Sequence, residues 1–174
     1  LDMDDQANVE LWEDKDQQNN GLPGIFWYTP VKKVKPGATV LVAGDGPIGL
    51  LALQAVLADG AGWAVVSGAS PVKLTLARKL GAHAVVNVRT DDPVAFVLDQ
   101  TGGLGVDFAV EASGVPAAVD QCLRAVRQGG TVSLIGIYER PIEKIDLGMV
   151  FFRDVTLCGS VASPNAFVPT LRLM

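Results

Sequence analysis

The segment with the clearest chemical potential is GDGPIG, residues 44–49. It follows the short apolar, β-rich run Thr39–Ala43 and opens an apolar helix expected over Pro47–Ala58. At such a strand–turn–helix junction the first glycine permits a tight turn. The second leaves room for a pyrophosphate, and the third lets the helix lie close to the strand. We therefore predict dinucleotide binding through Gly44, Gly46 and Gly49, with a turn that serves packing alone as the alternative.

The start of the expected helix adds to this prediction. Unpaired N–H groups and a partial charge of roughly +0.5 at a helix N-terminus attract phosphate groups. Pro47 at the first helical position gives up an N–H that the helix would not bond itself. Asp45 brings a carboxylate near the expected anion site, and we expect its side chain to face solvent.

The end of the second expected strand, residues 63–67, bears on which dinucleotide binds. An Asp or Glu about 20 residues after the turn usually bonds the ribose hydroxyls of NAD. Here Gly68 stands 19 residues after the last glycine of the turn, so no carboxylate repels a 2′-phosphate. Ser67 and Ser70 offer hydroxyls and Lys73 a charge, although a solvated lysine is the alternative for Lys73. This pattern favours NADP(H) over NAD(H), and Gly68→Asp is expected to reverse the preference.

The elements that must position these residues alternate along the chain from Val34. Short apolar strands spaced by helices of about ten residues are typical of βαβ units, whose strands are buried on both faces. We predict an α/β fold, a doubly wound Rossmann sheet of about six mostly parallel strands with ligands beyond the strands' carboxyl ends. Further strands are expected at 84–87, 106–111, 131–137 and 155–158, and further helices at 71–80, 92–100, 116–127 and from 166.

Charge separates the N-terminal segment from the rest of the 174 residues. The chain carries a net charge of −5, and residues 1–20 hold seven acidic residues against one basic residue. The remaining residues are almost neutral, with 13 basic and 12 acidic side chains. We predict that residues 1–33 form an acidic, poorly ordered segment with an aromatic cluster at 26–28, and that residues 34–174 form the dinucleotide-binding domain.

Composition excludes several classes of protein. An apolar fraction of 49% with 19% charged residues is ordinary for a globular chain. The acidic balance gives nucleic acid no basic surface to bind. The longest uncharged apolar run, about residues 46–58, is too short to span a bilayer, and no secretory signal is visible. We expect a cytoplasmic protein without membrane or nucleic-acid partners.

Several motifs in order resemble the cofactor-binding half of the medium-chain, zinc-type alcohol and polyol dehydrogenases. The resemblance covers about residues 34–167 and implies an oxidoreductase, or its cofactor-binding portion, that transfers hydride between NAD(P) and a small-molecule alcohol or carbonyl. It also implies a homo-oligomer for the full enzyme. The motifs are Val40–Leu50, Ala77–Ala82, Thr101–Asp107, Glu111–Gly114, Gly129–Val132 and Leu157–Ser160.

The resemblance implies roles at matching positions. The pyrophosphate would be bound by Gly44, Gly46, Pro47, Ile48 and Gly49. The adenosine ribose would face Gly68, Ser70 and Lys73. The cofactor channel would be lined by Ala112, Ser113 and Gly114, and the nicotinamide would meet backbone groups of Ile135, Gly136 and Ile137. Gly159 and Ser160 would lie near the subunit contact.

The zinc ligands of the family are not recognisable in this sequence. The single histidine, His83, has no His-Glu partner, and we expect it to be a partly exposed turn residue. Cys122 and Cys158 are expected to be small core residues, so no metal site is predicted. The catalytic residues are therefore unknown, although Tyr138 and Ser113 could donate a proton in principle. An inactive nucleotide-binding module related to the dehydrogenases is the alternative to an enzyme.

Overall fold

The computed structural model describes residues 34–159. The expected N-terminal segment, its aromatic cluster, Ser160 and the last expected helix lie outside the described residues. Strands and helices alternate along the described part. The strands are β1 (Thr39–Ala43), β2 (Trp63–Gly68), β3 (Ala84–Asn87), β4 (Val106–Glu111), β5 (Val126–Leu134) and β6 (Thr156–Gly159). The helices are α2 (Pro47–Ala58), α3 (Pro71–Lys79), α4 (Pro93–Gln100), α5 (Pro116–Ala125) and α6 (Leu147–Phe152).

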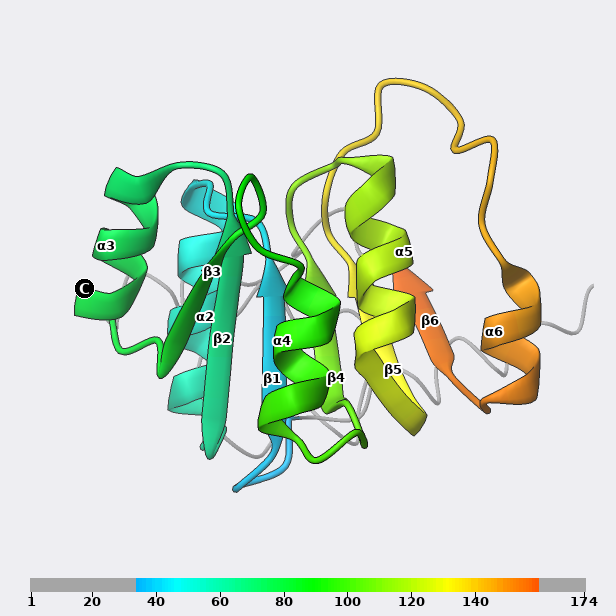
Figure 1. The fold of residues 1–174 in the computed structure, drawn as a ribbon, viewed down its shortest axis with the longest axis horizontal. Helices are drawn as coiled ribbons and strands as arrows, with labels where there is room; N and C mark the ends of the chain where they lie inside the picture. Colours follow the sequence, from blue (N-terminus) through cyan, green and yellow to red (C-terminus); the bar gives the residue numbers. More distant parts are fainter. Residues whose placement is uncertain (1–33, 160–174) are drawn as a thin grey trace, which may run out of the picture.

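The six strands form one parallel sheet in the order β3-β2-β1-β4-β5-β6 (Figure 1). The order reverses between β1 and β4, which lie side by side at the centre. All the strands run the same way, so their carboxyl ends share one edge of the sheet, uppermost in Figure 1. The predicted doubly wound α/β fold is confirmed, and its switch point lies directly after β1, where ligands of such sheets bind.

Local sequence explains where the helices begin. Pro occupies the first helical turn of α2, α3, α4 and α5, where a missing N–H has no intrahelical partner to lose. Ser70 accepts a hydrogen bond from the N–H of Lys73 at the start of α3. Asp92 accepts one from the N–H of Val94, 2.8 Å away, at the start of α4. These caps satisfy N–H groups that the helices cannot bond internally.

The core consists of two apolar layers, one on each face of the sheet. Alternate residues of a strand point to opposite faces, so Val40 and Val42 pack toward α2 and α3 while Leu41 and Ala43 pack toward α4 and α5. All four side chains are fully buried or nearly so. Double-sided burial explains why β1 is apolar throughout and fixes its position at the centre.

The largest differences from the sequence-based boundaries lie at α5 and β5. Helix α5 ends at Ala125 rather than at residue 127, and β5 runs from Val126 to Leu134 rather than over 131–137. The pairing of β5 with β4 shifts register between Val106 and Phe108, so β5 starts with an irregular stretch that the sequence pattern did not reveal. Residues 135–137 therefore belong to a loop. Helix α6, only six residues long, was not predicted.

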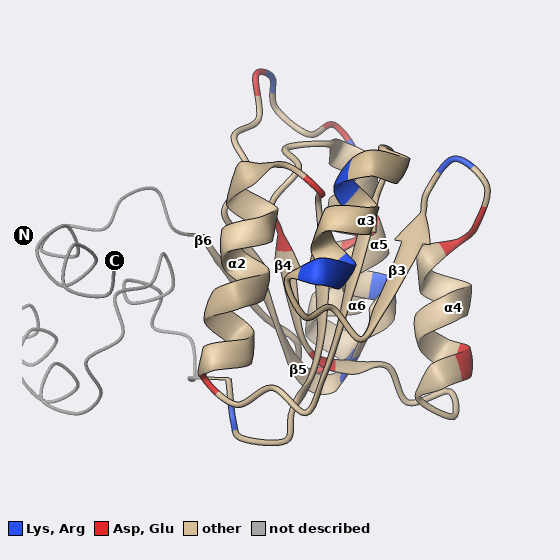
Figure 2. Ribbon diagram, turned by 90° about the vertical axis from the view of Figure 1, so that its left-hand side faces the viewer, with Lys and Arg blue, Asp and Glu red and all other residues tan. Residues whose placement is uncertain are grey.

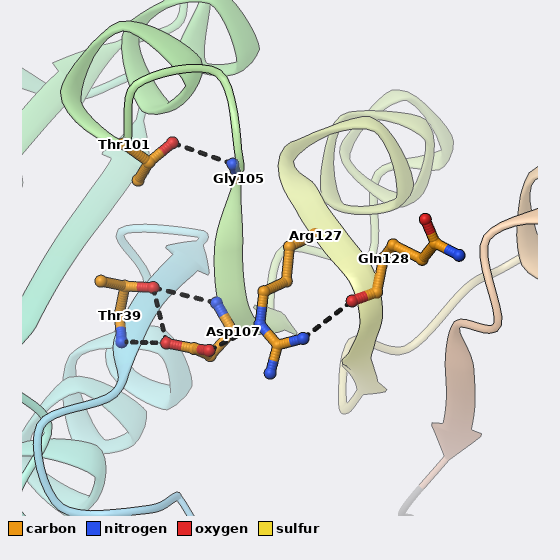
Figure 3. Close-up of polar contacts among 6 residues, drawn as sticks. All are labelled: Thr39, Thr101, Gly105, Asp107, Arg127 and Gln128. Carbon is orange, nitrogen blue, oxygen red and sulfur yellow. Dashed lines mark hydrogen bonds and ion pairs between the residues drawn. The ribbon is translucent and has the colours of Figure 1, made fainter.

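Polar contacts join three strands at the amino edge of the sheet (Figure 3). Asp107 on β4 accepts hydrogen bonds from the N–H and hydroxyl of Thr39 on β1, at 2.8 and 2.9 Å. Arg127 on β5 donates to the other carboxylate oxygen at 2.7 Å. Burial alone would raise the pKa of Asp107, but these hydrogen bonds outweigh it and the pKa lies below its ordinary value. The contacts hold β1, β4 and β5 in register at the end opposite the predicted site.

Within residues 34–159, no helix is both long enough and apolar enough to cross a bilayer.

Candidate dinucleotide site

Close packing accounts for two of the three glycines in the β1–α2 turn. Gly44 adopts a φ of +136°, and a Cβ there would lie 2.9 Å from the carbonyl carbon of Ala112. A Cβ at Gly49 would overlap the carbonyl oxygen of Gly44, because the first turn of α2 lies directly against the turn. The N–H of Gly44 donates to the carbonyl of Ser67, 2.8 Å away, which ties the turn to the end of β2. Both glycines are therefore needed by the fold itself.

The middle glycine of the turn has no such structural reason. Gly46 has a φ of −74°, which any residue adopts, and a Cβ there would meet no atom of residues 34–159 within 4 Å. No side chain of the described residues caps α2, whose first turn presents the N–H groups of Ile48 and Gly49. Open space beside uncapped N–H groups is the arrangement that a phosphate group requires. The fold thus fits the predicted role of this turn.

Asp45 does not face solvent as the sequence predicted. Its Oδ2 accepts a hydrogen bond from the N–H of Ser70, 2.7 Å away, and its side chain is half-buried. A Cβ on Gly68 would overlap Cβ and Cγ of Asp45 and lie 2.5 Å from Oδ2. The reason is the strand register: Ala43 pairs with Ser67, so the turn after β1 runs beside Gly68, and the missing side chain there leaves room for the carboxylate.

The other residues expected at the adenosine end differ in exposure. Ser67 is 3% exposed, so its hydroxyl lies inside the protein rather than at the ligand surface. Lys73 is exposed in the first turn of α3, whereas Arg78 and Lys79 lie in the last turn of that helix, and basic residues are marked blue in Figure 2. The structure therefore brings one carboxylate, Asp45, and one exposed lysine, Lys73, to the end of β2.

Glu111, the last residue of β4, is a fully buried carboxylate that the sequence analysis did not assign to the site. Its Oε1 accepts hydrogen bonds from the N–H of Ser113 at 2.8 Å, the hydroxyl of Ser113 at 2.5 Å and the N–H of Gly114 at 3.0 Å. Its Oε2 accepts from the hydroxyl of Tyr138. Four donors thus satisfy the buried group, and they come from the loops after β4 and β5.

These two loops also pack directly on each other. A Cβ at Gly114, whose φ is +70°, would overlap the carbonyl oxygen of Ile137. A Cβ at Gly136 would overlap Oε2 of Glu111 and the N–H nitrogen of Gly114. Ala112, which touches Gly44 on its other side, continues the contact to the β1–α2 turn. Ile137 is 86% exposed. It can therefore offer its backbone groups to a ligand, whereas its side chain contributes little to the buried apolar surface.

The two hydroxyls considered as proton donors both donate to Glu111. Burial raises the pKa of Tyr138 well above its ordinary value of 10, and the hydrogen bond to Glu111 and its negative charge raise it further. The Ser113 hydroxyl donates to Oε1 of the same carboxylate. These protons hold the loops in place and are not free for acid catalysis.

No group of three His, Cys, Asp or Glu side chains within the described part of the chain could hold a metal ion. His83 is exposed, and its Nδ1 accepts a hydrogen bond from the N–H of Ala64 at 3.0 Å. Cys122 is fully buried in α5 and Cys158 half-buried in β6, and burial raises the pKa of both thiols. Cys122 is thus a core residue, as the sequence predicted, whereas Cys158 is only partly buried.

The residues expected to bind the cofactor therefore lie along one edge of the sheet. The structure brings together the loops after β1, β2, β4 and β5, with contacts that run from Ser70 through Asp45 and Gly44 to Ser113 and Ile137. Asp45 and Glu111 are the two residues whose place sequence reasoning missed. The register of β1 against β2 would have placed Asp45, because the turn that follows one strand runs beside the end of the neighbouring strand.

Comparisons with known proteins find a matching family model and similar sequences. A family model described as zinc-binding dehydrogenase matches residues 47–174. L-threonine 3-dehydrogenase of Thermococcus kodakarensis is 41% identical over 123 residues, which cover 71% of this chain and 35% of that protein. The chain thus spans about a third of the length of this curated relative.

Solved structures share the fold. The 2R,3R-butanediol dehydrogenase of Bacillus subtilis superposes with a TM-score of 0.76 at 31% identity, over 86% of this chain and 42% of the other. A protein of Sinorhizobium meliloti described as a zinc-binding dehydrogenase, bound to NADP, superposes with a TM-score of 0.71 at 29% identity, over 81% and 44% of the two chains.

Proposed function

The chain belongs to the zinc-binding dehydrogenase family, and we propose that it is the dinucleotide-binding portion of an NAD(P)-dependent oxidoreductase that interconverts small alcohols and carbonyls. The observation that carries the proposal is the β1–α2 turn, where packing explains Gly44 and Gly49 but leaves Gly46 open beside uncapped N–H groups. Relatives are named for dehydrogenation of L-threonine and of 2R,3R-butanediol, which both carry hydroxyl groups. We propose a substrate of the same broad class and a homo-oligomeric full enzyme.

In the proposed function the residues of the carboxyl edge bind and orient the cofactor. The N–H groups of Ile48 and Gly49 bind the pyrophosphate, and Gly46 keeps the approach free of a side chain. The bound nicotinamide supplies the hydride acceptor or donor. Glu111 fixes the loops that carry Ser113 and Ile137, so that backbone groups of residues 135–137 meet the ring on one face. A fixed face is what stereospecific hydride transfer requires.

Zinc does not fit the described residues, because no three ligating side chains among them converge. The proposed role of residues 34–159 is therefore limited to the cofactor, and it includes no zinc-dependent step.

Two cofactors are compatible with the proposed function. The absence of a carboxylate on residue 68 itself and the exposed Lys73 in the first turn of α3 support NADP(H), as does the NADP-bound relative. The carboxylate of Asp45 beside Gly68 supports NAD(H).

A direct test is binding of reduced dinucleotide to the full chain and to Gly46→Val. A Cβ at position 46 would meet no atom of the described residues within 4 Å, so we expect the melting temperature of the free protein to change little while affinity falls at least about tenfold. Ala95→Val, an exposed site in the first turn of α4, is the matched control and should leave affinity unchanged. Nicotinamide fluorescence measures both. Absence of binding by the unmodified chain, or equal affinity in Gly46→Val, would contradict the proposal.

A further inference from the structure

We propose that Asp45 determines which dinucleotide the chain prefers: from the glycine-rich turn, its carboxylate bonds the adenosine ribose hydroxyls and excludes a 2′-phosphate, so that NAD(H) binds more tightly than NADP(H). This inference rests on the proposed function. It reverses the preference for NADP(H) that the sequence alone indicated, because that preference assumed that no carboxylate stood at the end of β2.

The position of the carboxylate carries the argument. In sheets of this kind an acidic side chain at the end of the second strand bonds the ribose 2′-hydroxyl. Residue 68 occupies that strand end here, and the first atom of any side chain on it would fall on Cβ and Cγ of Asp45 and 2.5 Å from Oδ2. The turn after β1 therefore delivers a carboxylate into the space where a side chain from β2 would begin.

The glycine at position 68 supports this interpretation independently. Its φ lies outside the left-handed region, so the backbone conformation does not require glycine. The three atoms nearest to a Cβ at this position all belong to Asp45 and would lie within 2.5 Å of it. Gly68 is thus explained by the side chain of Asp45, and the two residues form a complementary pair across β1 and β2.

The orientation of the carboxylate leaves it able to bind a ligand. The N–H of Ser70 donates to Oδ2 at 2.7 Å and fixes the side chain against the start of α3. Within residues 34–159 the hydrogen bond from Ser70 ends on Oδ2, so Oδ1 is left for a ribose hydroxyl, and Asp45 is only half-buried. A hydroxyl donates to a carboxylate, whereas a phosphate dianion offers only acceptors and like charge.

Lys73 is the competing feature at this end of the sheet. It is exposed in the first turn of α3, so its ammonium group is hydrated and free to adopt many rotamers. The carboxylate of Asp45, in contrast, is held in one position by the Ser70 N–H. A fixed group beside the strand end discriminates between a hydroxyl and a phosphate more strongly than a mobile one.

The test compares the affinity of the full chain for NADH and NADPH with that of two variants. A hydrogen bond to a charged group raises the affinity for a ligand by a factor of about ten or more. We therefore expect NADH to bind at least about tenfold more tightly than NADPH. Asp45→Asn keeps an oxygen for the Ser70 N–H but removes the charge, and most of the preference should disappear, chiefly because NADPH binds more tightly.

The second variant, Asp45→Gly combined with Gly68→Asp, moves the carboxylate from the turn to β2. Removing the side chain at 45 removes the three atoms nearest to a Cβ at 68, so we expect the exchange to be accommodated and the NADH preference to be restored. Asp45→Gly alone is the control and should lack the preference. Melting temperatures of all variants verify that each is folded.

The outcomes separate this inference from the proposed function. If both cofactors bind but NADPH binds as tightly or more tightly, or if Asp45→Asn leaves the ratio unchanged, the role of Asp45 is wrong and the dinucleotide site stands. If neither cofactor binds the unmodified chain, the proposed function and this inference both fail.

Discussion

Two carboxylates at the carboxyl edge of the sheet, those of Glu111 and Asp45, differ in burial and in the number of hydrogen bonds that they accept. Glu111, between the loops after β4 and β5, is fully buried and accepts four hydrogen bonds. Asp45, beside the end of β2, is half-buried and accepts one hydrogen bond from Ser70. A carboxylate whose oxygens are fully used shapes the protein, whereas one with an oxygen to spare can bind a ligand. We therefore assign the carboxylate of Glu111 to holding the loops of the site in place and the carboxylate of Asp45 to discriminating between ligands.

Glu111→Ala tests the structural role of Glu111, and we expect it to have the largest effect among these variants. It leaves the Tyr138 hydroxyl and the Gly114 N–H without their acceptor and opens a cavity. We expect the free energy of unfolding to fall by about 3 kcal/mol, measured by urea denaturation. Affinity for NADH and NADPH should fall in the same proportion, because the loops lose their support while Asp45 is untouched. A loss of unfolding free energy below about 1 kcal/mol, or a changed ratio of NADH to NADPH affinity, would contradict the structural role of Glu111.

Tyr138→Phe removes one of the four donors to Glu111 and should cost about 1.5 kcal/mol. The raised pKa of Tyr138 adds a pH signature. A group whose pKa is higher in the folded state contributes stability below its ordinary pKa of 10, and loses that contribution as the pH rises above 10. Urea denaturation between pH 8 and about pH 11 should therefore show a steeper alkaline decline for the unmodified chain than for Tyr138→Phe. Parallel curves would show that Glu111 does not hold this proton.

Asp107→Asn tests a third carboxylate at the opposite edge of the sheet, where Asp107 joins Thr39 and Arg127 by hydrogen bonds (Figure 3). Its pKa is lowered, so its contribution is present above the ordinary value of 3.8 and is lost as the pH falls below that value. The Asn variant should show a shallower loss of stability in acid. The side chain is partly exposed, so the effect at neutral pH should be only about 0.5 kcal/mol. Cofactor affinity should not change. A changed affinity would indicate that the ligand binds at the amino edge of the sheet and not at the carboxyl edge.

Local sequence predicted most of the fold but little of the contrast between the carboxylates. The bounds of β1 and α2 follow from neighbours in sequence: an apolar strand, a glycine turn and a proline at the first helical position. The start of β5 could not be predicted, because it depends on a register shift against β4. Helix α6 is too short to show a periodic pattern.

The glycines of the turn could be predicted from local sequence, whereas the positions of the two carboxylates could not. Gly44, Gly46 and Gly49 act within one short segment, so their spacing alone indicates their roles. The contact of Asp45 with Ser70 spans 25 residues, and that of Glu111 with Tyr138 spans 27. Such contacts depend on which strands are neighbours and in what register, and the sequence pattern left both undetermined.

The central claim is that the carboxyl edge, and specifically the β1–α2 turn, binds a dinucleotide. Titration of the isotope-labelled full chain with NADH, followed by the amide resonances in NMR spectra, tests it most directly. The account predicts large, saturable shifts at Gly46, Ile48 and Gly49 and none at the amino-edge residues Thr39 and Arg127. Saturable shifts confined to the amino edge, or no shift in the turn at saturating NADH, would contradict it.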